Sequence, residues 1–108
     1  MTVEQLAKQL SLDVLCMPDA QREVSGGYAG DLLSWVMGRA QAGDAWITIM
    51  SNVNIVAVAT LADPSCIILS EGVAPDEGVV EKAQGIGVNI LASRKDTFAL
   101  CADVAALI

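Results

Sequence analysis

Apolar residues recur along the chain in two patterns, one typical of amphipathic helices and the other of buried strands. Near the start, Val3, Leu6, Ala7 and Leu10 lie three or four positions apart, which predicts a helix that buries one face. Short continuous apolar runs predict strands covered on both faces. Together these patterns predict five helices, Val3–Leu10, Asp31–Gln41, Val53–Leu61, Gly78–Gln84 and Thr97–Leu107, and four strands, Asp13–Met17, Trp46–Met50, Cys66–Leu69 and Val88–Leu91.

The order of these elements predicts the fold class. From Trp46 onward, strands and helices alternate, and this alternation favours parallel strands joined by crossover helices. We therefore expect a three-layer α/β fold with a mainly parallel sheet of four strands, or slightly more, and helices on both faces. A chain of 108 residues has the ordinary size of one domain, so residues 1–108 are expected to form a single unit.

A glycine-rich junction before the second predicted helix is the first candidate ligand site. Ser25, Gly26, Gly27 and Tyr28 are predicted to form a flexible turn that opens this helix, whose backbone N–H groups would cradle an anion. No lysine follows to complete a phosphate-binding loop, and Asp31 in the first turn would repel a phosphate. The alternative is a tight turn that needs glycine for positive φ and for close packing beneath it.

A second candidate site follows the strand Trp46–Met50. Ser51, Asn52 and Asn54 offer uncharged hydrogen-bonding groups at the point where this strand passes into a helix. Ligands of open α/β sheets bind at the carboxyl ends of strands, so we expect these side chains to meet the Gly26-Gly27 turn there. The alternative is that Asn52 only caps the helix.

Composition and charge limit the possible partners. Hydrophobic residues make up 54% of the chain and aromatic ones only 4%, so the excess is aliphatic. This favours either a dense core or a surface covered by a second copy, and we expect a homodimer. The net charge of −7 disfavours nucleic-acid binding. The uncharged stretch from Ala45 to Ala62 is interrupted by polar residues, so we expect a strand and a helix there and no membrane span.

The residues of common catalytic and metal sites are scarce. The chain has no histidine, so Ser-His and Cys-His nucleophiles are excluded within it, and no CxxC or phosphate-loop motif occurs. We identify no catalytic residue, no metal ligand set and no required cofactor. Cys16, Cys66 and Cys101 lie far apart and are expected to be buried as small apolar residues, which indicates a reducing cytoplasm.

Several segments taken together resemble a known family. The ordered set comprises residues 2–6, 12–15, 22–28, 31–34, 46–48, 54–59, 67–68 and 75–77, and it covers nearly the whole chain. It resembles the small stand-alone DRTGG-domain proteins, and its opening segment also resembles the non-catalytic N-terminal domain of HPr kinase/phosphorylase. The chain departs from the family in lacking the Asp-Arg-Thr-Gly-Gly string, whose place is held by Ser51-Asn52-Val53-Asn54 without a cation.

The resemblance implies a role in regulation. DRTGG domains accompany CBS domains, so by analogy a nucleotide is a candidate ligand. The resemblance implies a cytoplasmic, non-enzymatic domain that senses a ligand or binds a partner. Because similar stand-alone members are associated with iron-only hydrogenase and related redox genes, the alternative is an accessory or assembly partner of such an enzyme. That partner would bind an apolar face around Trp35 or the last helix.

Overall fold

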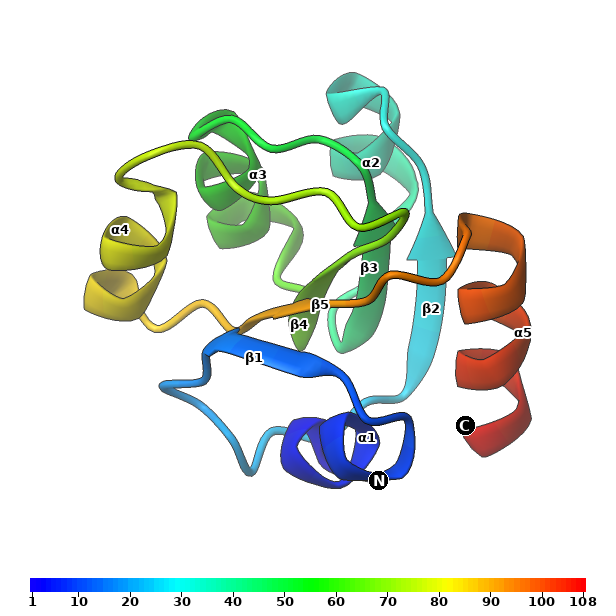
Figure 1. The fold of residues 1–108 in the computed structure, drawn as a ribbon. Helices are drawn as coiled ribbons and strands as arrows, with labels where there is room; N and C mark the ends of the chain where they lie inside the picture. The colour runs from blue at the N-terminus through cyan, green and yellow to red at the C-terminus, as the bar shows by residue number, and fades with distance from the viewer.

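The computed structural model describes all of residues 1–108, which form a five-stranded sheet between two layers of helices (Figure 1). The strands are β1 (Asp13–Cys16), β2 (Gly26–Ala29), β3 (Asp44–Thr48), β4 (Cys66–Leu69) and β5 (Ile90–Ala92). The helices are α1 (Val3–Gln9), α2 (Leu33–Arg39), α3 (Asn54–Ala62), α4 (Val79–Ile86) and α5 (Thr97–Leu107). No helix is both long enough and apolar enough to cross a membrane.

The strands lie in the order β1-β5-β4-β3-β2. Strands β2, β3, β4 and β5 are parallel to their neighbours, and β1 pairs antiparallel with β5. The predicted mainly parallel sheet is therefore confirmed, with one strand more than the four that the apolar runs indicated. Because β1 and β2 close the order, they are the two edge strands.

Two hydrophobic clusters lie on the two faces of the sheet, which confirms the predicted three layers. Successive side chains of a strand point to opposite faces, so Ile47 enters one cluster and Trp46 the other. Helices α1 and α5 cover the face of Ile47, and α2, α3 and α4 cover the face of Trp46 (Figure 1). All residues of β3 and β4 are buried, so these central strands anchor the sheet.

The glycine junction does not form the turn that the sequence predicted. Gly26, Gly27 and Tyr28 belong to β2, where Tyr28 pairs with Trp46, and neither of the two glycines has a positive φ. What requires glycine at position 26 is close packing, because a methyl group there would lie 2.7 Å from Oδ1 of the buried Asp44. Of the alternative reading of these glycines, the close packing is confirmed at Gly26, whereas the tight turn with positive φ is not, because the residues form a strand.

Asp31 also has a different place from the predicted one. Helix α2 begins at Leu33, two residues later, and Asp31 lies in the connection between β2 and α2. Its Oδ1 accepts hydrogen bonds from Thr48 Oγ1 at 2.8 Å and from Ile49 N at 2.9 Å. The carboxylate therefore ties this connection to the end of β3 instead of acting on the dipole of a helix.

Predicted helix starts were confirmed where a capping side chain marks them. Thr2 and Gln5 form a capping box at the start of α1, and the Asp96 side chain accepts from Ala99 N at the start of α5. Helix α4 begins at Val79, one residue after the predicted Gly78, which has a φ of 87°. Strand β1 was expected to be buried, but it is an edge strand with its first two residues exposed.

Candidate functional site

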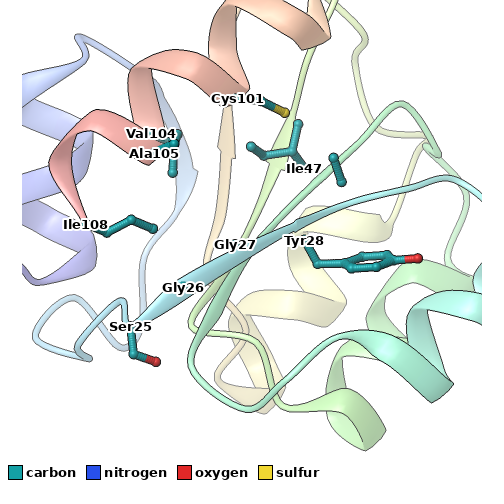
Figure 2. Close-up of a pocket in the computed structure, with 10 residues that line it drawn as sticks. Ser25, Gly26, Gly27, Tyr28, Ile47, Cys101, Val104, Ala105 and Ile108 are labelled. Atoms are coloured by element: carbon teal, nitrogen blue, oxygen red, sulfur yellow. The ribbon is translucent and has the colours of Figure 1, made fainter.

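A pocket of about 410 Å³ lies between β2 and α5 (Figure 2). Consecutive residues of β2 and its approach form one side, and residues of α5 form the other. Its lining comprises Ser25, Gly26, Gly27, Tyr28, Ala29 and Ile47 on the side of the sheet, with Cys101, Val104 and Ala105 from α5 and Ile108 directly after it. Pockets of this size, mostly apolar with a few polar groups, are typical of small-molecule sites.

Strand geometry decides which groups of β2 face the pocket. Gly27 and Ala29 pair with Ala45 and Ile47, whose side chains enter the cluster beneath α5, so positions 27 and 29 face the helix. The ring of Tyr28 points away from α5, toward the opposite face of the sheet (Figure 2). Tyr28 and Gly26 therefore line the pocket with main-chain atoms.

The main-chain groups of Gly27 and Ala29 lie on the free edge of the sheet. Gly30 N donates to Ile47 O at 3.1 Å, and Ile47 pairs with Ala29, so the N–H of Gly30 is directed toward β3. The N–H and C=O groups of successive strand residues alternate in direction, so those of Tyr28 also face β3 and those of Gly27 and Ala29 point away from it. No strand follows β2 in the sheet order, so these donors and acceptors are open to a ligand or partner.

The pocket is uncharged. Its lining contains no Asp, Glu, Lys or Arg, and its polar side chains are the Ser25 hydroxyl and the Cys101 thiol. Burial raises the pKa of the Cys101 thiol, which keeps it protonated. This chemistry suits a neutral, partly apolar group that also forms hydrogen bonds to the strand edge.

The second set of predicted site residues lies in the loop after β3. Ser51 Oγ is 3.1 Å from Asp76 Oδ1, and Ser51 O accepts from Asp76 N at 2.9 Å. Asn52 Oδ1 accepts from Asn54 N at 2.9 Å, so Asn52 caps the first turn of α3, although the residue at the N-cap position is Val53. The side chains of Ser51 and Asn52 thus hold the loop and the helix start together.

The two sets of predicted residues do not meet, contrary to expectation. Gly26 pairs with Asp44 at the first residue of β3, whereas Ser51 follows the last residue of that strand, Thr48. Positions 44 and 51 are seven steps apart along the chain, which is on the order of 20 Å when the chain is extended. The glycines were expected in a turn at the carboxyl ends of strands; as part of a parallel strand, they start beside the amino end of β3.

Some of the charged side chains elsewhere form local pairs. Arg22 donates to Asp63 Oδ1 at 2.7 Å, and this bond is the main reason that the pKa of Asp63 lies below its usual value. Lys95 pairs with Asp103 of α5. No three acidic or cysteine side chains lie close enough together to hold a metal ion.

Sequence comparison assigns the chain to a known domain type. The sequence model of the DRTGG domain matches residues 5–107. The chain belongs to the DRTGG domain family. The resemblance of the separate segments is thereby confirmed over nearly the whole length of the chain, even though the Asp-Arg-Thr-Gly-Gly string itself is missing. No curated protein matches the sequence of this DRTGG domain.

A solved structure has the same fold. It is the crystal structure of the CBS and DRTGG domains of the regulatory region of Clostridium perfringens pyrophosphatase, complexed with its activator, diadenosine tetraphosphate. The TM-score is 0.71 at 15% sequence identity, and the similarity covers 95% of this chain and 45% of the other. This DRTGG domain therefore spans less than half of that regulatory region, and the comparison establishes the shared fold.

The residues that α5 contributes to the pocket were not identified as site residues from the sequence. The almost continuous apolar character of residues 97–108 is typical of a helix that packs between layers or between subunits. That pattern contains no information on which strand the helix faces. The spacing of Cys101, Val104, Ala105 and Ile108 on one helical face was the available signal.

Proposed function

We propose that this DRTGG domain is a cytoplasmic regulatory domain without catalytic activity, which binds a small ligand between β2 and α5 and acts as a homodimer. The observation that carries the proposal is the pocket of about 410 Å³ beside a strand edge with unpaired backbone groups. Such an edge offers donors and acceptors at fixed positions, and the apolar wall of α5 adds contact area. Membership of the DRTGG family and the fold shared with a pyrophosphatase regulatory region support regulation over catalysis.

Nucleotides are the first ligands to test, because the similar pyrophosphatase region was crystallised with diadenosine tetraphosphate. The uncharged lining favours binding of the base over binding of the phosphates. A purine carries donors and acceptors along one edge, which complement the outward N–H and C=O groups of Gly27 and Ala29. The flat ring would lie against Gly27, where the absence of a side chain leaves room.

A thermal-shift panel tests this proposal with adenosine, AMP, ATP and diadenosine tetraphosphate. A ligand at a concentration of 100 Kd stabilises the folded state by about 2.7 kcal/mol. For a domain near 100 residues this raises Tm by roughly 10 °C or more. We expect adenosine to act nearly as well as the phosphorylated probes, since the pocket holds no cation.

Two variants distinguish the two candidate sites. Gly27→Val places a branched side chain in the pocket and is expected to abolish the shift, whereas Asn52→Ala is expected to leave it unchanged. If no probe raises Tm, or if Gly27→Val responds like the natural chain, the proposed nucleotide site is wrong. Loss of the response in Asn52→Ala alone would move the site to the loop after β3.

The second candidate function is an accessory or assembly role beside an iron-only hydrogenase or related redox enzyme. Its structural support is an exposed face of α2, where Trp35 is 52% exposed, Leu32 is exposed beside it, and the Arg39 guanidinium lies 3.6 Å from the centre of the Trp35 ring. Exposed Trp and Arg are enriched at protein interfaces. Co-purification with hydrogenase subunits that Trp35→Ala abolishes would favour this function over ligand sensing.

A further inference from the structure

We propose that a second binding site lies at the carboxyl ends of β4 and β5, and that it takes a small zwitterion, a free α-amino acid with an apolar side chain. The site is a cavity of about 220 Å³ whose lining includes the oppositely charged Asp13 and Arg94. It shares no residue with the pocket between β2 and α5, so it is independent of the proposed nucleotide site.

The topology of the sheet opens a crevice at this point. Helix α4, which follows β4, covers the face of Trp46, whereas α5, which follows β5, covers the face of Ile47 (Figure 1). The connections of these two neighbouring strands therefore leave the sheet toward opposite faces. In open α/β sheets, ligands bind in the crevice that such a divergence leaves outside the carboxyl ends of the strands. The pairs β2–β3 and β3–β4 offer no such point, because α2, α3 and α4 all lie on one face.

Main-chain hydrogen bonds hold the two loops that border this crevice. Gly72 N donates to Ser93 O at 3.0 Å, and Glu71 N donates to Lys95 O at 2.8 Å, so the loops run together directly after the strands. Glu71 and Gly72 have a left-handed backbone, with φ of 61° and 72°, and from this turn residues 73–75 continue toward α4. The walls of the cavity are therefore in place before a ligand binds, which lowers the cost of binding.

Strand β1 supplies the third side of the cavity. Its residue Leu15 and the β5 residue Ala92 both line the cavity and pack against the hydrophobic cluster on the face of Trp46. Asp13 pairs with Ala92, and directly opposed residues of a sheet share a face. The Asp13 carboxylate is therefore held beside an apolar surface, which Val73 extends from the loop after β4.

The two charged residues of the cavity are not paired. Neither Asp13 nor Arg94 takes part in an ion pair of the structure, and both are exposed, whereas the neighbouring Lys95 is bound to Asp103. An ammonium group can donate to the Asp13 carboxylate, and the Arg94 guanidinium can donate two parallel hydrogen bonds to a carboxylate. A free α-amino acid carries both groups on one carbon atom, and its side chain would contact the apolar surface between them.

Size and charge favour this ligand over larger or more acidic ones. Pockets for drug-sized ligands measure about 300–1,000 Å³, so a cavity of about 220 Å³ favours a ligand with fewer atoms. A phosphate group would be repelled by Asp13 and by the net charge of −7 on the chain. A zwitterion has no net charge and avoids this repulsion.

Amide chemical-shift titration of the full chain with L-leucine tests the proposal. We expect saturable shifts at Gly72, Val73, Ala74 and Arg94, with a dissociation constant on the order of 1 mM. The analogues 4-methylpentanoate and 3-methylbutylamine each lack one of the two charges of leucine, and each should bind roughly 10- to 100-fold more weakly. Adenosine should leave these amides unshifted, so the titration reports on this site separately from the nucleotide site.

Substitutions at the two exposed charges locate the site. Arg94→Gln and Asp13→Asn should each weaken leucine binding roughly 10- to 100-fold while the rest of the spectrum stays that of the folded chain. Lys82→Gln and Glu81→Gln are the matched controls, because both residues are exposed on α4 outside the cavity, and they should bind leucine like the natural chain.

Three results would overturn the proposal. The first is the absence of a saturable shift with L-leucine. The second is equal binding of 4-methylpentanoate and leucine together with no effect of Asp13→Asn, which would make the cavity an anion site. The third is a loss of binding in the control variants as large as the loss in Arg94→Gln and Asp13→Asn.

Discussion

Alanine substitutions at the two neighbouring glycines of β2 should change stability in opposite directions. At Gly27 the added methyl group would meet only Ala45 O at 3.6 Å, an ordinary contact distance. At Gly26 it would lie 2.7 Å from Asp44 Oδ1, and Asp44 is buried with its other carboxylate oxygen accepting from Gln41 N. The carboxylate of Asp44 therefore has little freedom to move aside.

The structure sets the magnitudes of the two effects. Replacing glycine by alanine at a compatible position stabilises a protein by about 0.4–1 kcal/mol, because the unfolded chain loses conformational freedom. Gly27→Ala should gain this amount. Gly26→Ala gains the same but forces a steric adjustment that costs about 1–3 kcal/mol. We therefore expect a net loss of roughly 1–2 kcal/mol at Gly26.

Urea denaturation followed by circular dichroism measures both free energies of unfolding. Each kcal/mol also shifts Tm by about 4–8 °C in a domain of this size class, so melting curves give an independent reading. If the two glycines formed a turn with positive φ, both variants would be destabilised. A loss above about 1 kcal/mol in Gly27→Ala would thus refute the strand conformation and the open pocket face beside it.

Three further predictions concern buried and paired side chains. Asn89 is buried, accepts a hydrogen bond from the Asp19 amide and donates to two carbonyl groups. Asn89→Asp should lower the unfolding free energy by about 2–4 kcal/mol at pH 7 and by less in acid, where the new carboxyl group is protonated. The exposed control Asn54→Asp should leave the unfolding free energy nearly unchanged. Hydrogen bonding to Arg22 lowers the pKa of Asp63, so the pair stabilises the fold above about pH 4, and this contribution is lost as the pH falls through the folded pKa. Asp63→Asn should lower the unfolding free energy measured in urea by about 0.2–1 kcal/mol at pH 7, and should leave it unchanged near pH 2. Full burial raises the pKa of Cys66 to about 12, so iodoacetamide at pH 8 should modify the half-buried Cys101 before Cys66. Peptide mass spectra recorded over time measure both modification rates, and equal rates would contradict the burial of Cys66.

The central part of the fold could be predicted from the sequence because its signals are local and strong. Residues 66–69 form a continuous apolar run, which is what a strand buried on both faces requires. The bounds of α5 were predicted correctly at Thr97 and Leu107, and in the structure the side chain of Asp96 caps its first turn. In both cases the deciding interaction lies within or next to the element itself.

The edge strand β2 could not be predicted in this way. Two consecutive glycines have low strand propensity, and their conformation is decided by pairing with β3, a partner almost twenty positions away in the chain. The role of Asp31 likewise depends on hydrogen bonds to Thr48 and Ile49. Such long-range contacts leave no periodic signal in the sequence.

The candidate site was also predicted only in part from the sequence. Ser25, Gly26, Gly27 and Tyr28 were selected from the sequence as an anion-binding turn, and they do line a pocket, but as an edge strand with an uncharged environment. The second half of the pocket comes from α5, whose apolar spacing indicated burial and could not indicate a partner strand. The lining of the pocket depends on tertiary packing of segments more than seventy residues apart.

Amide chemical-shift mapping by nuclear magnetic resonance, with adenosine and diadenosine tetraphosphate as probes, shows where a ligand binds on the folded chain. We predict saturable shifts of the Gly27, Ala29, Cys101 and Ala105 amides, with no comparable shifts in the loop of residues 51–54. Shifts confined to that loop, or no saturable shift with either probe, would contradict the claim that the groove between β2 and α5 is the ligand site of this DRTGG domain.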